Sequence, residues 1–237
     1  MQRIIHRANG GAYPENTLEA IKWAVKADAE GIEIDIQLSK DDVPMVFHYP
    51  HLRRLTGRNS LLRELSVTEL KSLIVSSKNS DKSGTIPTLE EAIEILKGKK
   101  MFYIELKKGD SDKIAESVLN VLKKRLSEDS FTLSSFDPNL IKAVKAKNEQ
   151  IRTGYIFSTK LRRFFLNRTE KQVGGFDQWH IENSLLNERL LKKAGKRNRE
   201  LMVWKVNSEV QMKRCIELGV DGIITDNITK LNEVLSG

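Results

Sequence analysis

Short apolar runs rich in β-branched residues alternate along this chain with longer segments that are apolar on one face only. The first kind of pattern predicts buried strands, and the second predicts amphipathic helices. The predicted strands are 3–5, 32–38, 101–106, 131–135, 152–157, 178–182, 201–206 and 222–225, with a further short strand at 45–47. The predicted helices are 17–29, 66–74, one that begins at Thr88, 112–126, one that begins near Pro138, 160–172, 184–194, 208–218 and 227–235.

The order of these elements decides the fold class. Strand–helix alternation over 237 residues, with no linker that would separate domains, predicts one α/β domain with a parallel sheet. Eight such units in a chain of this length favour a closed (β/α)8 TIM barrel spanning residues 1–237. The structural alternative is an open doubly wound sheet, but the glycine fingerprint of dinucleotide-binding folds is absent after the first strand.

Composition narrows the setting of the protein. A hydrophobic fraction of 39% and a charged fraction of 30% are ordinary for a globular domain. No apolar run is long enough for a membrane span, and the N-terminus lacks the apolar core of a signal peptide. Cys215 is the only cysteine, so an intramolecular disulfide is excluded. These features predict a cytoplasmic protein.

The net charge of +8 raises the question of an anionic partner. Basic residues are densest at 160–171 and 192–199, but elsewhere they are scattered. Scattered charge favours a solvated basic face over a nucleic-acid site, so no nucleic-acid partner is expected. Phe164, Phe165 and Leu166 lie inside the first basic run and leave weak contact with a membrane surface as a further option.

Three acidic residues lie in predicted strands, at positions that a barrel would bring close together. Glu33 and Asp35 alternate with isoleucines in the second predicted strand, and Glu105 is near the end of the third. The active site of such a barrel lies at the carboxyl ends of the strands, where these side chains would converge and raise one another's pKa values unless a cation were present. Oxygen ligands suit Mg²⁺ or Ca²⁺ rather than zinc. Taken singly, each acid also fits a solvent-facing strand position.

Two histidines and two cations complete the candidate site. His6 and His48 each follow a predicted strand, Arg7 is next to His6, and Lys107 follows Glu105 by two residues. Imidazoles beside a metal can share general acid and base roles near neutral pH. Arg7 and Lys107 supply fixed positive charge of the kind that holds a phosphate. Together these groups predict a site that cleaves phosphodiesters.

The sequence resembles the glycerophosphodiester phosphodiesterases. The resemblance spans nearly the whole chain and is carried by an ordered set of motifs: "HRANGGAYPENT" (6–17), "GIEIDIQLSKDDVPMVFH" (31–48), "LRRLTG" (52–57), "IPTLEEAI" (86–93), "IELK" (104–107), "VWKVN" (203–207) and "GVDGIITD" (219–226). It implies a metal-dependent barrel enzyme that hydrolyses glycerophosphodiesters to an alcohol and sn-glycerol 3-phosphate, with a small insertion at 48–87 beside the barrel mouth.

The resemblance also implies a role for each candidate residue. His6 and His48 match the catalytic histidines, Arg7 and Lys107 match residues that lie at the phosphate, and the metal carboxylates match Glu33, Asp35 and Glu105. Tyr49 and Trp204 are expected near the substrate pocket. Arg7 lies beside His6 and favours His6 as the base, which leaves His48 as the acid.

Two positions depart from the family pattern. Ala8 stands where the family usually has Gly, and Tyr49 stands where it usually has an acid after the second histidine. Loss of that acid predicts weaker metal binding, a shifted substrate preference or a slowed enzyme. Two other functions therefore stay open: a lysophospholipase D, which acts on a diester that keeps one acyl chain, and a catalytically weakened barrel that binds phospholipid headgroups. Headgroup preference, metal identity and oligomeric state are left open by the sequence.

Overall fold

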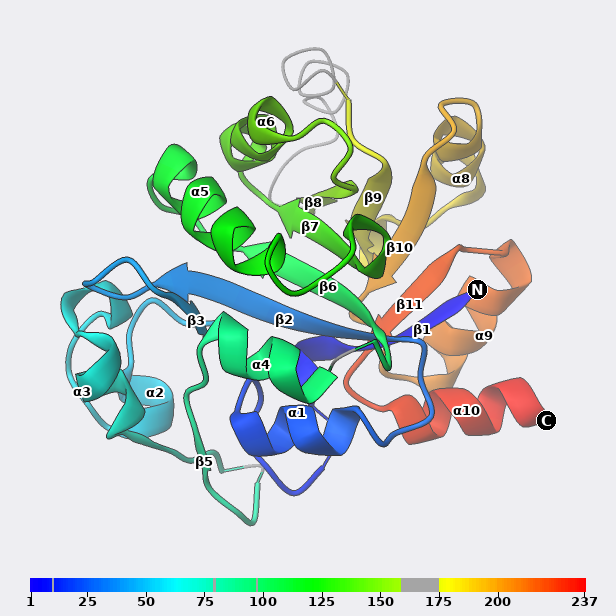
Figure 1. Ribbon diagram of the computed structural model, residues 1–237. Coiled ribbons are helices and arrows are strands. Elements are labelled where there is room, and N and C mark those ends of the chain that lie inside the picture. Colours follow the sequence, from blue (N-terminus) through cyan, green and yellow to red (C-terminus); the bar gives the residue numbers. More distant parts are fainter. Residues whose placement is uncertain (10, 79, 97, 159–174) are drawn as a thin grey trace.

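The computed structural model describes residues 1–9, 11–78, 80–96, 98–158 and 175–237. Eight parallel strands form its central sheet, and β1 pairs with both β2 and β11, so the sheet closes on itself (Figure 1). The barrel strands are β1 (Gln2–Ile5), β2 (Gly31–Leu38), β6 (Met101–Leu106), β7 (Phe131–Ser135), β8 (Thr153–Phe157), β9 (Gln178–Glu182), β10 (Glu200–Trp204) and β11 (Gly222–Thr225). The predicted (β/α)8 barrel is thus confirmed.

Helices cover the outside of this barrel. They are α1 (Leu18–Ala24), α4 (Leu89–Leu96), α5 (Ser111–Leu122), α6 (Pro138–Lys147), α8 (Glu188–Gly195), α9 (Glu209–Leu218) and α10 (Ile228–Ser236), with 3-10 turns at Glu128–Ser130 and Asn183–Leu185. Most begin at a residue whose side chain accepts a backbone N–H of the first turn, as Thr17 does for α1 and Ser208 for α9. The helix predicted at 160–172 lies outside the described residues.

Besides the helix predicted at 112–126, which ends at Leu122, two helix predictions were too long. The helix predicted at 17–29 ends at Ala24, because Lys26 and Ala27 donate to carbonyls three residues back, which tightens the last turn. The helix predicted at 66–74 is reduced to α3 (Val67–Lys71), since Ile74 and Val75 form a two-residue strand instead. In both cases apolar periodicity runs past the point where the backbone stops being helical.

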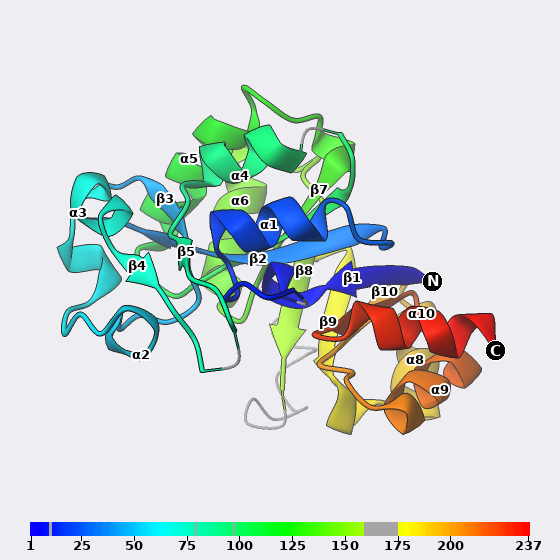
Figure 2. The same ribbon diagram turned by 90° about the horizontal axis from the view of Figure 1, so that it is seen from below.

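The segment predicted to be an insertion, residues 48–87 and called the insertion segment below, lies at the end of the barrel toward which β2 points (Figures 1 and 2). Before it, β3 (Pro44–Val46) pairs antiparallel with the end of β2. The segment contains α2 (Arg53–Thr56), the 3-10 turn Leu62–Glu64, α3, β4 (Ile74–Val75) and β5 (Gly84–Thr85). Its side chains have an apolar cluster of their own, built mainly of Leu52, Leu62, Leu70, Val75 and Ile86.

The central strands are buried on both faces, which explains the alternation of isoleucines and acids in β2. Ile32, Ile34 and Ile36 pack in the main cluster between strands and helices. Glu33 and Asp35 lie on the opposite face of the strand, which is the inside of the barrel, and both are buried. The sequence therefore places two carboxylates in the barrel interior.

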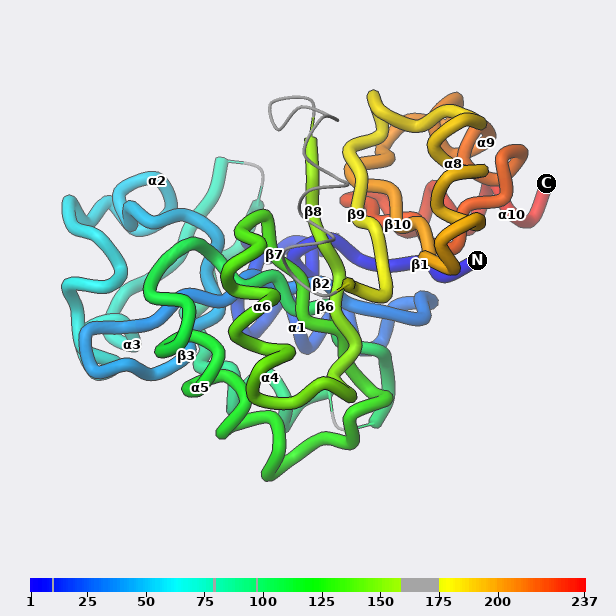
Figure 3. The backbone as a smooth tube through the Cα atoms, turned by 90° about the horizontal axis from the view of Figure 1, so that it is seen from above, coloured from blue at the N-terminus to red at the C-terminus, as the bar shows by residue number. Residues whose placement is uncertain are grey.

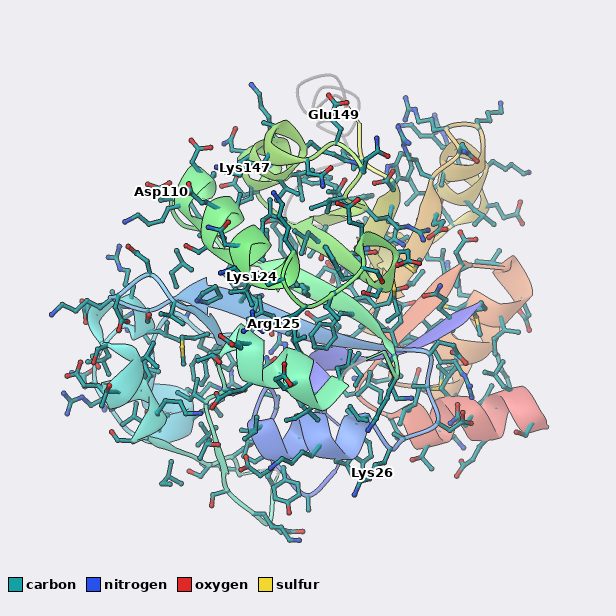
Figure 4. The ribbon with its side chains drawn as sticks, viewed as in Figure 1. Lys26, Asp110, Lys124, Arg125, Lys147 and Glu149 are labelled. Atoms are coloured by element: carbon teal, nitrogen blue, oxygen red, sulfur yellow. The ribbon has the colours of Figure 1, made fainter. Side chains whose placement is uncertain are left out.

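The outer surface carries charges of both signs. Figure 4 shows Lys26, Asp110, Lys124, Arg125, Lys147 and Glu149 projecting outward from α1, α5, α6 and their ends. Several such cations are paired, as Arg125 is with Glu90 and Lys147 with Glu116 at 3.4 Å. Both termini lie near α10, on the side away from α2 and α3 (Figure 3). None of the helices in the described part of the chain is both long enough and apolar enough to cross a membrane.

Candidate active site

A cavity of about 220 Å³ opens among residues at the carboxyl ends of the barrel strands. One part of its wall is polar and consists of His6, Arg7, Glu33, His48, Glu105 and Lys107. All six were predicted from the sequence to belong to one site. The other part is largely apolar and includes Phe136, Ile156, Trp204 and Ile224. Of the two residues expected near the substrate, Trp204 lines this cavity and Tyr49 is not part of its lining.

Three carboxylates meet at the polar wall, and two of them, Glu33 and Glu105, are part of it. Glu33, Asp35 and Glu105 each offer an oxygen, and these oxygens all lie within 4.8 Å of one another. The arrangement follows from strand register, because β2 and β6 are parallel neighbours that place Asp35 directly beside Glu105. All three side chains are buried, and Asp35 is completely inaccessible. We refer to these residues as the carboxylate cluster.

Two cations contact the carboxylate cluster. The ammonium nitrogen Nζ of Lys107 lies 2.6 Å from Oδ1 of Asp35, and it also pairs with Glu105. The guanidinium of Arg7 lies 3.4 Å from Oδ2 of Asp35 and donates to Glu15 at 3.0 Å. Because both cations also line the cavity, an anion in the cavity would meet the same two cations that contact the cluster.

Burial and neighbouring charge separate the pKa values within the cluster. Burial, followed by repulsion from Asp35 and Glu105, raises the pKa of Glu33 well above 4.5. Burial also raises the pKa of Glu105. For Asp35 burial acts in the same direction, but the charges of Lys107 and Arg7 outweigh it and hold its pKa below the usual range. The cluster therefore has an excess of carboxyl groups over the cations that neutralise it.

The cluster fits a divalent cation by the chemistry of its donors. Glu33, Asp35 and Glu105 offer only oxygen atoms, which is the ligand set of a hard ion such as Mg²⁺ or Ca²⁺ and not that of zinc. The raised pKa of Glu33 points the same way, because a divalent charge would relieve the repulsion that raises it.

The loop after β1 is held in an unusual conformation that aims its groups at the cluster. Arg7 and Ala8 both have φ near 53°, a left-handed conformation that side chains other than Gly adopt rarely. The turn directs the backbone N–H of Arg7 to Oε2 of Glu33 at 2.8 Å. Since functional sites often retain such strain, the conformation agrees with a role for this loop.

Asn16 is a site residue that the sequence-based reasoning missed. It directly precedes Thr17, the residue that caps α1. The Asn16 side chain instead donates to Oδ2 of Asp35 at 2.7 Å and accepts the Asp35 backbone N–H at 3.3 Å. It thus holds one carboxylate of the cluster in place. Asn16 is part of "PENT" in the first motif, but the motif did not indicate that its side chain binds Asp35.

His6 contacts a second missed residue, Asp226. The Nδ1 atom of His6 lies 2.6 Å from Oδ1 of Asp226, which follows β11. Burial lowers the pKa of His6, while the hydrogen bond to Asp226 opposes that effect and Arg7 adds to it. Asp226 is the last residue of the "GVDGIITD" motif, so the sequence predicted that it lies near a strand end. The sequence did not predict that it contacts His6.

His48 has different surroundings. Burial, together with the positive charges of Lys107 and Arg7, lowers its pKa to about 3, against the opposing effect of Asp35. Its neighbour Tyr49 meets the imidazole edge-on, with ring centroids 4.5 Å apart. The Tyr49 ring also contacts the guanidinium of Arg54, whose Cζ lies 4.5 Å from the ring centroid, and meets the ring of Phe47 edge-on with centroids 6.4 Å apart. The Tyr49 ring therefore faces Arg54 of the insertion segment and does not line the cavity.

A third histidine, His180, also lines the cavity and was not predicted. It is buried, and burial lowers its pKa to about 3. Its Nε2 lies 2.9 Å from Oε1 of Gln178, and the ring fits over Gly154, where an added Cβ would come within 2.6 Å of Nε2. These contacts make His180 a neutral, tightly packed part of the barrel interior.

The chain is similar to known proteins over nearly its whole length. A family model described as the glycerophosphoryl diester phosphodiesterase family matches residues 6–230. The chain is 29% identical to a glycerophosphodiester phosphodiesterase of Caldanaerobacter subterraneus, over 99% of this chain and 98% of that protein. It is 25% identical to a lysophospholipase D of Homo sapiens, over 99% of this chain and 86% of that protein.

Solved structures show the same similarity. A phosphodiesterase of Oleispira antarctica, in complex with the product sn-glycerol-3-phosphate, superposes with a TM-score of 0.90 at 26% identity, covering 100% of this chain and 97% of that one. A glycerophosphodiester phosphodiesterase of Thermotoga maritima has a TM-score of 0.79 at 30% identity, covering 99% and 98% respectively.

Proposed function

The chain belongs to the glycerophosphoryl diester phosphodiesterase family, and on this basis we propose that it hydrolyses glycerophosphodiesters to an alcohol and sn-glycerol 3-phosphate. The observation that carries the proposal is the convergence of His6, His48, Lys107 and the carboxylate cluster on one cavity. A phosphodiester needs its charge neutralised, a nucleophile deprotonated and a leaving alkoxide protonated, and this set of groups can do all three.

The carboxylate cluster is proposed to hold a divalent metal ion, Mg²⁺ or Ca²⁺. When bound, such an ion supplies charge that stabilises the negative phosphoryl oxygens. Lys107 and Arg7 contribute fixed positive charge from the cavity wall beside it. Both cations contact Asp35, so they also neutralise part of the negative charge of the cluster before metal or substrate binds.

The two histidines are proposed to divide the proton transfers. His6 is neutral at neutral pH because burial lowers its pKa, so its free ring nitrogen can take a proton from the nucleophile, which is either water or the glycerol hydroxyl of the substrate. His48 is proposed to give a proton to the departing alcohol. A bound phosphodiester places negative charge near His48, which favours the protonated ring that this role requires.

The apolar wall favours one second candidate. The rings of Phe136 and Trp204 meet edge-to-face with their centroids 5.7 Å apart. Together with Ile156 they give the cavity an apolar part in addition to the charged one. Such a surface could receive the acyl-bearing part of a lysophospholipid, which is the substrate class of a lysophospholipase D. The residues Phe164, Phe165 and Leu166, which suggested membrane contact, lie outside the described residues.

A product assay tests both candidates. Purified protein is incubated with glycerophosphocholine, glycerophosphoethanolamine, glycerophosphoglycerol and a lysophosphatidylcholine, with Mg²⁺, with Ca²⁺ and with a chelator. We expect release of sn-glycerol 3-phosphate that stops with the chelator and with Asp35→Asn. Release of lysophosphatidic acid instead would favour the second candidate. Binding of these lipids without turnover under any metal condition would indicate a non-catalytic barrel.

A further inference from the structure

Asp226, which contacts His6, is itself hydrogen-bonded to a residue that follows a third strand. Asn207, which follows β10, donates from its side chain to Oδ2 of Asp226 at 2.7 Å. The same side chain accepts the backbone N–H of Asp226 at 2.9 Å. The strands β1, β11 and β10 are consecutive in the barrel, so the three residues form a chain of contacts across its rim.

We propose that Asp226, oriented by Asn207, is a positioning residue that fixes His6 in the one tautomer able to act as a base. The proposal rests on the function proposed above, since that function gives His6 its role. Among the described residues, Asp226 belongs neither to the carboxylate cluster nor to the cavity lining, so it acts through His6, which does line the cavity.

The hydrogen-bonding chemistry decides the tautomer. An ionised carboxylate only accepts hydrogen bonds, so the 2.6 Å contact requires the proton of His6 to sit on Nδ1. Nε2 is then left with its lone pair, and His6 lines the cavity. The hydrogen bonds to His6 and Asn207 outweigh burial and hold the pKa of Asp226 below its usual range, so it remains an acceptor.

The same carboxylate supports the step that follows. When His6 takes a proton it becomes an imidazolium, and a carboxylate at 2.6 Å stabilises that charge. Lys205, whose Nζ lies 3.4 Å from Oδ2 of Asp226, belongs to the same group of contacts. His48 differs, because its Nδ1 is buried and has no hydrogen-bond partner within the described ranges. Only one of the two histidines is therefore built as a carboxylate-supported base.

The contacts of Asn207 make one substitution especially informative. In Asp226→Asn the new amide has one oxygen and one NH₂ group. Because the Asn207 side chain donates to this position, the amide should turn its oxygen toward Asn207 and its NH₂ toward His6. His6 Nδ1 must then accept, which moves the ring proton to Nε2 and abolishes the base. Asp226→Ala removes the partner without imposing the wrong tautomer, so it should be the milder change.

The tautomer is read without substrate by ¹⁵N–¹H correlation NMR of histidine-labelled protein, with the His6 signals assigned from His6→Gln. We expect protonated Nδ1 in the wild type, protonated Nε2 in Asp226→Asn and a mixture in Asp226→Ala. In the diester assay kcat should fall by about 10²- to 10⁴-fold for Asp226→Asn, the range for loss of a general base, and less for Asp226→Ala. KM should change by less than about threefold, since neither variant alters a group that contacts substrate.

Asn207→Ala provides a second variant at an exposed position, and we expect a smaller drop in kcat with a partial tautomer mixture. The matched control is Asp177→Asn, which removes an ion-paired carboxylate that accepts from Thr153 and Lys145, away from the cavity. It should leave the His6 signals and kcat unchanged. Retention of protonated Nδ1 in Asp226→Asn, or a reversed tautomer with wild-type kcat, would overturn the proposal. A wild type with the expected tautomer but no diester hydrolysis would instead refute the proposed function.

Discussion

Lys107 is paired with Asp35 inside the barrel, with 2.6 Å between the ammonium nitrogen and Oδ1. The lysine also pairs with Glu105, so one cation serves two of the three carboxylates in the cluster. Burial alone would lower the pKa of Lys107, but these two anions outweigh it and raise that pKa above its usual value. The charged ammonium of Lys107 therefore partly neutralises the carboxylate cluster, whose members are the proposed ligands of the metal.

Lys107→Met should make the metal-free protein less stable. The substitution leaves buried carboxylates without their cation, and breaking a buried pair in this way typically costs about 3 kcal/mol. The gain in melting temperature on adding Mg²⁺ or Ca²⁺ should then be larger than in the wild type, because the ion replaces the missing charge. Calorimetry with and without divalent ions measures both effects. Lys113→Met, at an exposed pair with Asp42, is the control and should change neither. Equal metal-induced shifts in wild type and Lys107→Met would contradict this interpretation.

The metal ligands can be tested one at a time. Glu33→Gln, Asp35→Asn and Glu105→Gln should each weaken binding of Mg²⁺ or Ca²⁺, because each removes a negative ligand. In the wild type, a metal at a hundredfold excess over Kd should stabilise the fold by about 2.7 kcal/mol by mass action. Titration calorimetry gives the affinity, and Glu91→Gln, which removes a carboxylate that pairs with Lys71, controls for a general loss of charge. If the wild type binds no divalent ion at millimolar concentration, the three residues are not a metal site.

The raised pKa of Glu33 predicts how stability depends on pH. The unfolded chain releases this proton near pH 4.5, whereas the folded protein keeps it to a higher pH. Between those two pH values the folded state binds more protons, so this residue makes stability fall as pH rises. The lowered pKa values of His48 and His180 act in the opposite direction below pH 6.5, so the test is the difference between wild type and Glu33→Gln. We expect Glu33→Gln to gain stability over the wild type as pH rises without metal, and Mg²⁺ to reduce that gain. A pH-independent difference would contradict the assignment.

Tyr49 can be examined by introducing the acid that the resemblance led us to expect at its position. The sequence suggested that an acid there would lie beside the metal. The structure places the Tyr49 ring against Arg54, so a carboxylate introduced by Tyr49→Asp should pair with that guanidinium. Metal affinity should therefore change by less than about twofold, and Arg54→Ala should leave it unchanged as well. Tyr49→Phe keeps the ring and serves as the control. A clear gain in metal affinity in Tyr49→Asp alone would show that the acid reaches the cluster.

Much of this molecule could be predicted because it depends on local patterns. Strand and helix periodicity gave the barrel, and barrel geometry then brought Asp35 and Glu105 together, since β2 and β6 are parallel neighbours in register. The contact of Asp226 with His6 was missed because it joins residues 220 positions apart. It exists only because closure places the last strand beside the first. Knowing that the barrel closes does not specify which side chains meet across that seam.

The contact between Arg54 and Tyr49 was missed for a different reason. It depends on how the chain turns within the insertion segment just after His48, and this segment packs around an apolar cluster of its own. Short irregular elements of this kind lack the periodicity from which strands and helices are predicted. The expectation for Tyr49 was therefore based on the acid that the family pattern has after the second histidine. That comparison predicts which residue is near the site but not the direction in which its side chain points.

The division of labour between the histidines gives the last prediction. An alkyl alcohol is a poor leaving group, so its departure depends on the general acid, whose help is typically worth about 10²- to 10⁴-fold in rate. A p-nitrophenolate departs readily without a proton. His48→Ala should therefore lose most of its activity on glycerophosphocholine but recover most of it on a p-nitrophenyl phosphodiester. His6→Ala should be inactive on both, because deprotonation of the nucleophile is needed for either substrate. Steady-state rates on the two substrates measure the difference. Equal losses for both variants on both substrates would defeat the assignment, and rescue of His6→Ala alone would reverse it. The structure favours His6 as the base because, within the described ranges, it is the one of the two histidines that has a carboxylate at 2.6 Å to stabilise a newly gained proton.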